Sequence, residues 1–221
     1  MLFCATVARL YFLGVGWMKR QMVYVLGFVG FLVFFTTAWA MTSRLGYESA
    51  DYQRIESDGN IEIREYPELV LAATTSDLDS QGRDGSFMRL FRYISGDNQA
   101  KQKIAMTTPV FMESEQETTA VSMGFVMPGE LAAQGVPEPK SDGVQIRERP
   151  AGRFAVIRFA GQLDSQVARK QEAKLREWME RRGLEGVLES ECAGYDPPFT
   201  PGPLRRNEVL IRLVDEKDST E

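Results

Sequence analysis

The feature that most restricts the fold of this 221-residue chain is a short segment that occurs twice. Ile61–Pro67 (IEIREYP) and Val144–Pro150 (VQIRERP) match without a gap. In each copy apolar and polar residues alternate, as in a strand with one buried face, and a proline ends the segment where a missing amide hydrogen does no harm. A second apolar strand follows each copy, at Leu69–Thr75 and Phe154–Phe159. Each copy is therefore expected to begin with a hairpin-like pair of strands.

A helical pattern follows each pair of strands. The first helix is expected at Ser86–Ile94, where apolar residues recur at i, i+3, i+4 and i+7 and Gly96 ends the pattern. The second begins at an N-cap, Asp164 or Ser165, ends before Gly183 and carries two i,i+4 ion pairs. The two apolar stripes consist of Phe87, Leu90, Phe91 and Ile94, and of Ala168, Leu175, Trp178 and Met179.

Further strands are expected after the helices, at Lys103–Met112, Thr119–Met127 and Glu208–Val214, which gives the order β-β-α-β-β twice. Neither half can bury both a sheet face and a helix alone. We therefore expect an α+β fold, a distorted β-barrel or shared sheet related by a pseudo-twofold and flanked by two helices. Residues 41–214 would form one domain with loops at Gly82–Gly85, Pro128–Gly143 and Pro197–Pro203, and residues 215–221 a polar tail.

Residues 1–40 are expected to be a signal peptide or an N-terminal membrane anchor. Val23–Ala40 is an uncharged run that follows Lys19 and Arg20, and Ala38-Trp39-Ala40 matches a cleavage site. The true start would then be Met18 or Met22. The same run, if uncleaved, is long enough at the lower limit to span a bilayer. Both interpretations place the rest of the chain outside the cytoplasm, in a periplasmic or other extracytoplasmic compartment.

Composition excludes several classes of function. The net charge is −5, and it becomes −8 without residues 1–40, so there is no basic surface for a nucleic acid. The chain has no histidine, which removes His-based triads, His-zinc sites and an imidazole ligand for haem iron. Of its two cysteines only Cys192 lies beyond residue 40, and without a partner base it is expected to be a buried structural thiol. No enzyme is predicted.

Few residues point to a binding site, and each has a structural alternative. The stripe with Phe87, Met88 and Phe91 either lines an apolar cleft or packs on the sheet. Tyr195 belongs to the turn signal Tyr195-Asp196-Pro197-Pro198. The segment Arg205-Arg206-Asn207-Glu208 either recognises a carboxylate or an amphiphilic cation, or forms surface ion pairs. Methionines in two neighbouring strands, among them Met106, are gap-fillers or adaptable ligand walls.

Four motifs in order resemble the SOUL haem-binding protein family, over essentially Tyr47–Leu213. They are Lys103-Ile-Ala-Met-Thr-Thr-Pro-Val110, Met123-Gly-Phe-Val-Met-Pro128, Phe154-Ala-Val-Ile-Arg-Phe-Ala-Gly161, and Ala193-Gly-Tyr-Asp-Pro-Pro198 with Arg205-Arg-Asn-Glu-Val209. The resemblance implies a distorted β-barrel with two flanking helices, shared with drug-binding domains of bacterial regulators. It also implies a shallow apolar cleft for haem or another tetrapyrrole beside the first helix, at Phe87, Phe91 and Arg92.

The chain departs from the family at charged positions. Asp84 and Thr200 align where a haem-binding relative has basic residues, and Arg92 alone keeps a matching charge. With no histidine, an iron ligand would have to be Met, Tyr or Cys192. The resulting hypothesis is an exported, non-enzymatic haem- or tetrapyrrole-binding protein whose site contains Phe87, Met88, Phe91, Arg92, Tyr195, Arg205 and Glu208 and holds no metal of its own. The alternatives are an amphiphile- or cation-binding domain in which Glu208 pairs with the ligand, and a structural envelope protein that contacts a partner.

Overall fold

The computed structural model describes residues 21–22, 24–32, 34, 46–76, 85–114, 121–197 and 200–214. They belong to two units, Met1–Ser43 and Arg44–Glu221, which are described separately. In the first unit, residues 21–22, 24–32 and 34 are helical. No helix in these described ranges has the length and apolar character needed to cross a membrane. Of the two predicted starts, Met18 lies outside the described residues and Met22 within them. The cleavage site at Ala40, the loop residues 82–84, Pro198 and the tail at 215–221 also lie outside them.

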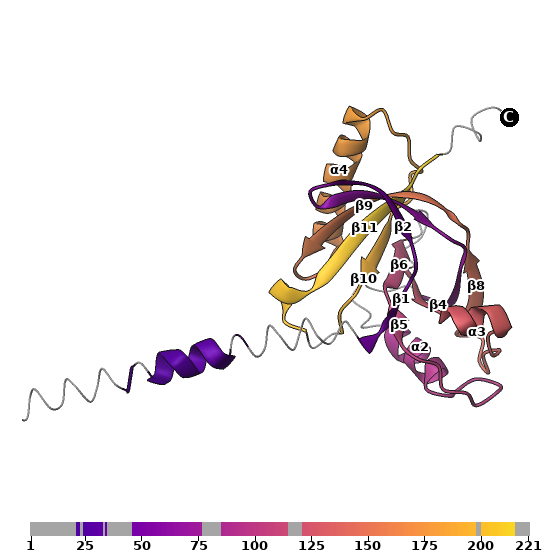
Figure 1. Ribbon diagram of the computed structural model, residues 1–221. Helices are drawn as coiled ribbons and strands as arrows, with labels where there is room; N and C mark the ends of the chain where they lie inside the picture. The colour runs from indigo at the N-terminus through magenta and orange to yellow at the C-terminus, as the bar shows by residue number, and fades with distance from the viewer. Residues whose placement is uncertain are drawn as a thin grey trace, which may run out of the picture. The chain divides into compact units, whose positions relative to one another are not determined.

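The second unit is built on one curled antiparallel sheet of nine strands in the order β2-β3-β9-β11-β10-β6-β7-β4-β8 (Figure 1). A separate parallel pair joins β1 to β5. The elements are β1 (Glu48–Ser49), β2 (Gln53–Asp58), β3 (Ile61–Tyr66), β4 (Leu69–Ser76), α2 (Ser86–Ile94), β5 (Thr107–Thr108), β6 (Val110–Ser114), β7 (Val121–Val126), α3 (Gly129–Gln134), β8 (Gln145–Arg149), β9 (Gly152–Ala160), α4 (Ser165–Arg181), β10 (Glu191–Gly194), the 3-10 turn η2 (Gly202–Leu204) and β11 (Arg206–Arg212).

The predicted α+β class is confirmed, with the sheet curled into a half-barrel whose edges are β2 and β8. The order β-β-α-β-β occurs as β3-β4-α2-β6-β7 and again as β8-β9-α4-β10-β11. The two sets take equivalent places in the sheet. If β3, β4, β6 and β7 are exchanged with β8, β9, β10 and β11, the strand order from β3 to β8 becomes the same order read backwards. The pseudo-twofold relation of the two halves stays a prediction.

The predicted hairpins are wrong. β3 pairs with β9 and β4 pairs with β8, so the first two strands of each half lie on strands of the other half. Two residues link β3 to β4, and two link β8 to β9. A two-residue hairpin turn needs positive φ angles, which these links cannot provide at their first residue. The first residue of each link is a proline, Pro67 or Pro150. The proline ring holds φ in the negative range found in turns and extended chain. The exchange of strands therefore joins the two halves into one sheet.

Other differences from the expected elements have simple causes. The strand expected at Lys103–Met112 is divided at Pro109 into β5 and β6, since proline has no amide hydrogen for the ladder. All six residues of β2 are exposed, so its sequence shows no alternation. Two elements were not expected, the short strand β10 and the helix α3. Helix α3 lies inside the loop that was predicted at Pro128–Gly143.

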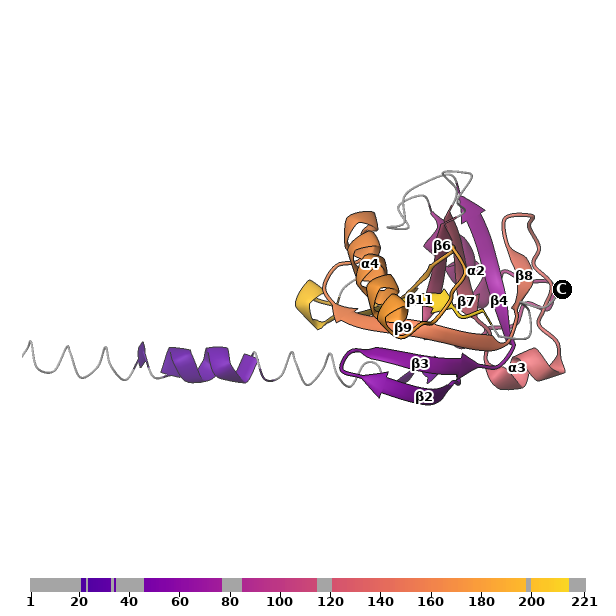
Figure 2. The ribbon, with the colours of Figure 1, turned by 90° about the horizontal axis from the view of Figure 1, so that it is seen from above.

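The core consists of three clusters of buried residues. Because successive side chains of a strand point to opposite faces of the sheet, one strand can contribute to two clusters. One fills the concave side of the curled sheet, with Tyr66, Leu71, Phe111 and Phe154 among its members. A second lies between the sheet and α4, which Figure 2 shows crossing β9. The third lies between the sheet and α2, which packs on β4 and β7. Strands in the middle of the sheet are therefore buried on both faces.

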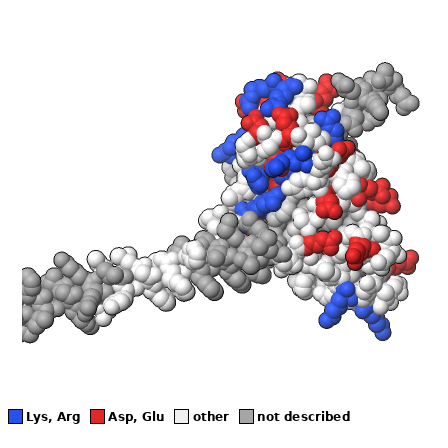
Figure 3. All heavy atoms as spheres, viewed as in Figure 1, with Lys and Arg blue, Asp and Glu red and all other residues white. Residues whose placement is uncertain are grey.

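Helix α4 has the predicted boundaries and surface. Asp164 is its N-cap and accepts hydrogen bonds from the amides of Gln166 and Val167. The two expected ion pairs are present, with Nη2 of Arg176 2.8 Å from Glu172 and Nη1 of Arg181 2.7 Å from Glu177. Figure 3 shows both signs of charge intermixed over this helix.

Candidate functional site

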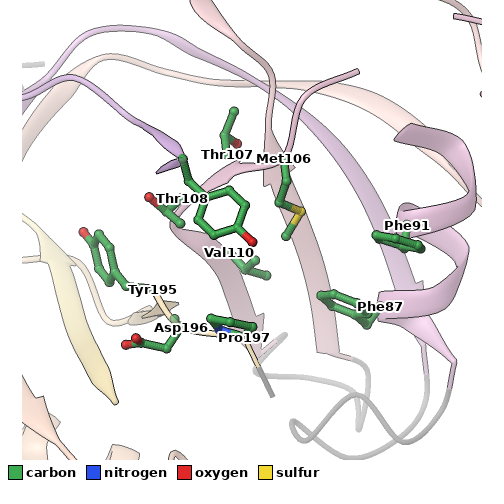
Figure 4. A pocket seen from close by; sticks show the side chains of 11 residues that line it. Phe87, Phe91, Met106, Thr107, Thr108, Val110, Tyr195, Asp196 and Pro197 are labelled. Atoms are coloured by element: carbon green, nitrogen blue, oxygen red, sulfur yellow. The ribbon is translucent and has the colours of Figure 1, made fainter. Parts of the chain in front are cut away.

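An apolar pocket of about 250 Å³ lies between α2 and the segment that follows β10 (Figure 4). Phe87 and Phe91 of α2 form one side, and Tyr195 and Pro197 face them from the other. Met106 and Val110, which come just before and just after β5, lie between the two sides. With Tyr47, which also lines the pocket, four separate parts of the sequence contribute to it.

The start of α2 is fixed by backbone geometry and by one arginine. Gly85 precedes the helix with a φ of +84°, in the left-handed region that favours glycine. Arg89 donates from Nε to the Thr74 hydroxyl on β4 (3.1 Å) and from Nη2 to the Ser86 hydroxyl (3.2 Å). These bonds hold the first turn of α2 against the sheet.

The predicted apolar stripe of α2 divides between the core and the pocket. Leu90 and Ile94 are buried against the sheet, whereas Phe91 is 43% exposed. The rings of Phe87 and Phe91 are nearly parallel, with an interplanar angle of 12° and centroids 6.1 Å apart. Phe87 also packs its ring against Phe125 of β7, at 5.3 Å. The core and cleft interpretations therefore apply to different residues of one stripe.

Tyr195 connects the pocket to a charged network inside the half-barrel. Its ring lines the pocket, while its hydroxyl points away and donates to Oε2 of Glu208 (2.8 Å) (Figure 4). The guanidinium of Arg206 lies over the same ring, 4.0 Å from its centroid. Burial and the nearby Glu208 charge hold the pKa of Tyr195 well above its usual value. The side chain is therefore a fixed, neutral part of the pocket wall.

Glu208 is fully buried and paired with two arginines. It accepts from Nη1 and Nη2 of Arg64 (2.7 and 2.9 Å) and from Nε and Nη2 of Arg206 (3.1 and 2.6 Å). Arg64 also donates to Glu62 (2.7 Å). Burial alone would raise the pKa of Glu208, but the hydrogen bonds and charges of Arg64 and Arg206 outweigh it and hold the pKa below its ordinary value.

The predicted site residues do not all meet at the pocket. Phe87, Phe91 and Tyr195 line it, and Met88 and Arg92 are exposed one position further around α2. Arg205 donates from Nε to the Thr200 carbonyl (2.8 Å) and Glu208 lies in the interior, so neither of these two belongs to the lining. The surface ion pair proposed for Glu208 is a buried one, because β11 is a central strand covered on both faces.

Eight residues of the pocket lining were not predicted as site residues, among them Tyr47, Met106 and Asp196. Met106 carried a signal, since it lies in the first family-like motif, but a methionine in a strand pattern reads equally as a gap-filler. Tyr47 precedes every periodic segment of the sequence. Only the fold brings these residues to α2.

The Cys192 thiol packs in the cluster beneath α4, and burial, aided by Glu172 and Glu191, raises its pKa to about 12. This agrees with a structural thiol. Within the described ranges, no three His, Cys, Asp or Glu side chains come together as a metal site.

A second, polar hollow of about 410 Å³ lies beside β4 and β8. Thr74, Thr75, Asp142, Gln145 and Arg147 contribute to its lining. Ligand pockets are mostly apolar with a few placed polar groups, and this hollow has the opposite character. The apolar pocket at α2 is therefore the stronger candidate.

Comparison with known proteins agrees with these observations. Residues 47–212 match the family model of the SOUL heme-binding proteins. Heme-binding protein 1 of Xenopus tropicalis is 32% identical over 127 residues, which are 55% of this chain and 66% of that protein. Its counterpart in Mus musculus is 25% identical over 188 residues, covering 80% and 91% of the two chains. The chain thus spans slightly less than two thirds of the Xenopus tropicalis relative.

Solved structures share the fold at low sequence identity. The C-terminal domain of EcmrR aligns with a TM-score of 0.53 and 14% identity, covering 74% of this chain and 98% of that domain. A hydrolase from Listeria innocua aligns with a TM-score of 0.53 and 11% identity, covering 72% and 94%. At these identities the likeness concerns the fold alone. The family match covers most of the compact unit, and the chain belongs to the SOUL heme-binding protein family.

Proposed function

We propose that this protein binds haem or another tetrapyrrole in the apolar pocket beside α2 and catalyses no reaction. The observation that carries the proposal is the pair of nearly parallel rings of Phe87 and Phe91 at the pocket edge. Flat aromatic faces stack on planar π-systems and bury large apolar areas. Relatives named heme-binding protein 1 and the family membership support a tetrapyrrole as the planar ligand.

The residues present fit such a macrocycle in part. The pocket volume of about 250 Å³ is just below the roughly 300–1,000 Å³ of typical ligand pockets. A large planar ligand would thus be enclosed along one edge and exposed along the other. Asp196 lines the pocket and, among the described lining residues, no Lys or Arg does. The carboxylates of a haem would therefore face solvent and not a cation of the pocket lining.

In this arrangement the protein itself supplies shape and exclusion of water. Phe87 is held by Phe125, and Tyr195 is held by Glu208 and Arg206, so both walls are fixed before a ligand arrives. Fixed walls reduce the entropy lost on binding. A bound haem would supply the iron chemistry of the complex.

The direct test is a titration of the full chain with haemin and with metal-free protoporphyrin IX, followed by the Soret absorbance. We expect saturable binding of both. F91A should weaken both by about tenfold, because a stacking face is lost. I55A is the matched control, since Ile55 is similarly exposed, at 48%, but lies on β2 outside the pocket lining. No saturable change with either ligand would refute the proposal.

A second candidate is binding of a cationic amphiphile, which Asp196 in the pocket lining favours. Glu208, the acid first expected to pair with a cation, already has both oxygens bonded to arginines. The two candidates separate on charge. A lipophilic cation such as rhodamine 6G should bind and respond to D196N under the second candidate, and should not compete with protoporphyrin IX under the first.

We further propose that residues 1–40 direct export, either as a cleaved signal or as an anchor. The proposal rests on Lys19 and Arg20 before the uncharged run Val23–Ala40. Mass spectrometry of the protein from a bacterial host distinguishes the two forms. Met41 at the N-terminus indicates cleavage, an intact start at Met18 or Met22 in the membrane fraction indicates an anchor, and an uncleaved cytoplasmic product contradicts export.

A further inference from the structure

The pocket contains one atom that can coordinate a soft metal centre. Of the described lining residues only Met106 carries sulfur, and its thioether points into the space between Phe87 on one side and Tyr195 with Pro197 on the other (Figure 4). Met112, in β6, packs against the same cluster under α2 as Met106 but is not among the lining residues. A thioether is a soft ligand that suits iron in a haem, as in the cytochromes with a methionine ligand.

Tyr195 and Cys192 could also ligate iron, but the first is occupied and the second lies elsewhere. The hydroxyl of Tyr195 is turned out of the pocket and donates to Glu208 (2.8 Å). Cys192 packs beneath α4, in the cluster on the other side of the sheet from Tyr195. Tyr47 also lines the pocket, but a phenolate oxygen is a hard ligand that prefers ferric iron. Met106 thus differs from Tyr195 and Cys192 in position, and from Tyr47 in the softness of its ligand atom.

We propose that Met106 is an axial ligand of the iron when this protein binds haem. The inference rests on the proposed function, because it applies only if a tetrapyrrole occupies the pocket. It adds a specificity to that site. The pocket should hold iron porphyrin more tightly than metal-free porphyrin, and it should favour the softer ferrous state over the ferric state. Packing on Phe87 and Phe91 would supply the remainder of the affinity.

The test compares three ligands and three variants in the full chain. The ligands are haemin, haem reduced with dithionite, and metal-free protoporphyrin IX. M106L keeps the volume and apolar character of the side chain but removes sulfur. M112L removes a thioether outside the pocket and is the matched control, and Y47F removes the competing oxygen.

We expect M106L to weaken binding of reduced haem by roughly tenfold or more, the lower end of the effect of mutations around metal sites, and to leave protoporphyrin IX unchanged. M112L should leave both affinities unchanged. Y47F keeps the ring in the pocket lining and removes only the hydroxyl, so it should not reproduce the selective loss of reduced haem that M106L causes. In wild-type protein with methyl-labelled methionine, reduced haem should move one methyl resonance far upfield, and M106L should abolish that resonance.

Two outcomes overturn the inference, and they differ in what they say of the proposed function. Met106 is not the ligand if M106L leaves both the affinity for reduced haem and the shifted methyl resonance unchanged, or if Y47F, and not M106L, weakens the binding of reduced haem. In either case, binding of protoporphyrin IX would still support the proposed function. If the wild-type protein binds none of the three ligands, the proposed function fails and the inference fails with it.

Discussion

The Arg64 guanidinium and the Glu208 carboxylate form a two-pronged ion pair inside the half-barrel, with Nη1–Oε2 and Nη2–Oε1 distances of 2.7 and 2.9 Å. Both side chains are completely buried. They come from β3 and β11, which lie on either side of β9, so the pair bridges across the concave face of the sheet. From its sequence, Glu208 was predicted to pair with a ligand or to form an ion pair at the surface. In the structure it forms this buried ion pair instead.

Removal of one partner should be strongly destabilising. R64M or E208Q leaves charge buried without its main partner, which typically lowers the free energy of unfolding by about 3–5 kcal/mol. Urea unfolding measures the change. The double variant R64M/E208M should lose less than the sum of the single losses. As a control, R181A removes an exposed ion pair of α4 and should change stability by less than about 1 kcal/mol. A loss as small for E208Q as for R181A contradicts this assignment.

Glu208 should also give the fold a specific acid sensitivity. The pKa of Glu208 is lower in the folded protein than its ordinary value of about 4.3. The stabilisation is therefore fully present above that ordinary value and is lost as the pH falls through the lower, folded pKa. The difference in unfolding free energy between wild type and E208Q should be constant from about pH 5 to 8 and should shrink below about pH 4. A difference that grows as the pH falls is the opposite of this prediction.

Burial of Glu208 was beyond the reach of the sequence pattern. Val209, Ile211 and Leu213 alternate as the apolar face of the last strand, and this pattern assigns Glu208 to solvent. β11 is, however, flanked by β9 and β10 and covered by α4 on one face and the concave core on the other. The alternation of apolar and polar residues identifies one buried face of a strand. It cannot show that a charged residue on the opposite face is also buried and neutralised by a partner.

The periodic spacing of apolar residues predicted the two long helices of the compact unit, because their bounds depend on nearby residues in the sequence. The bounds of α2 and α4 follow from helical spacing, the N-cap at Asp164 and the glycines that end them, and the structure has them as expected. The pairing of β3 with β9 and β4 with β8 joins segments that lie far apart along the chain, which no local signal records. For the same reason the sequence indicated Phe87 and Phe91 but not that Tyr47 and Met106 share their pocket.

The N-cap of α4 gives a prediction about local stability. Asp164 accepts from the amides of Gln166 (2.9 Å) and Val167 (2.8 Å), so D164A leaves two amides without this partner. We expect a loss of about 1 kcal/mol in the free energy of unfolding. D164S restores a capping oxygen and should recover most of it. Equal stability of D164A and wild type contradicts a capping role.

Cys192 should be unreactive while the protein is folded. Burial, together with the charges of Glu172 and Glu191, raises its pKa to about 12, and the thiolate is the reactive form. In a C4S background, which leaves Cys192 as the remaining cysteine, reaction with a disulfide reagent at pH 8 should be slow in buffer and fast in urea. Rapid, complete labelling of the folded protein is incompatible with this environment.

The position of the bound tetrapyrrole is the central claim, and methyl NMR of methionine-labelled protein tests it most directly. Metal-free protoporphyrin IX carries a strong ring current and no iron, so it reports proximity alone. Met106 lines the pocket and Met179 is buried under α4. We expect saturating protoporphyrin IX to shift the Met106 methyl resonance and to leave that of Met179 in place. A shift of Met179 with no change at Met106 would contradict binding in this pocket.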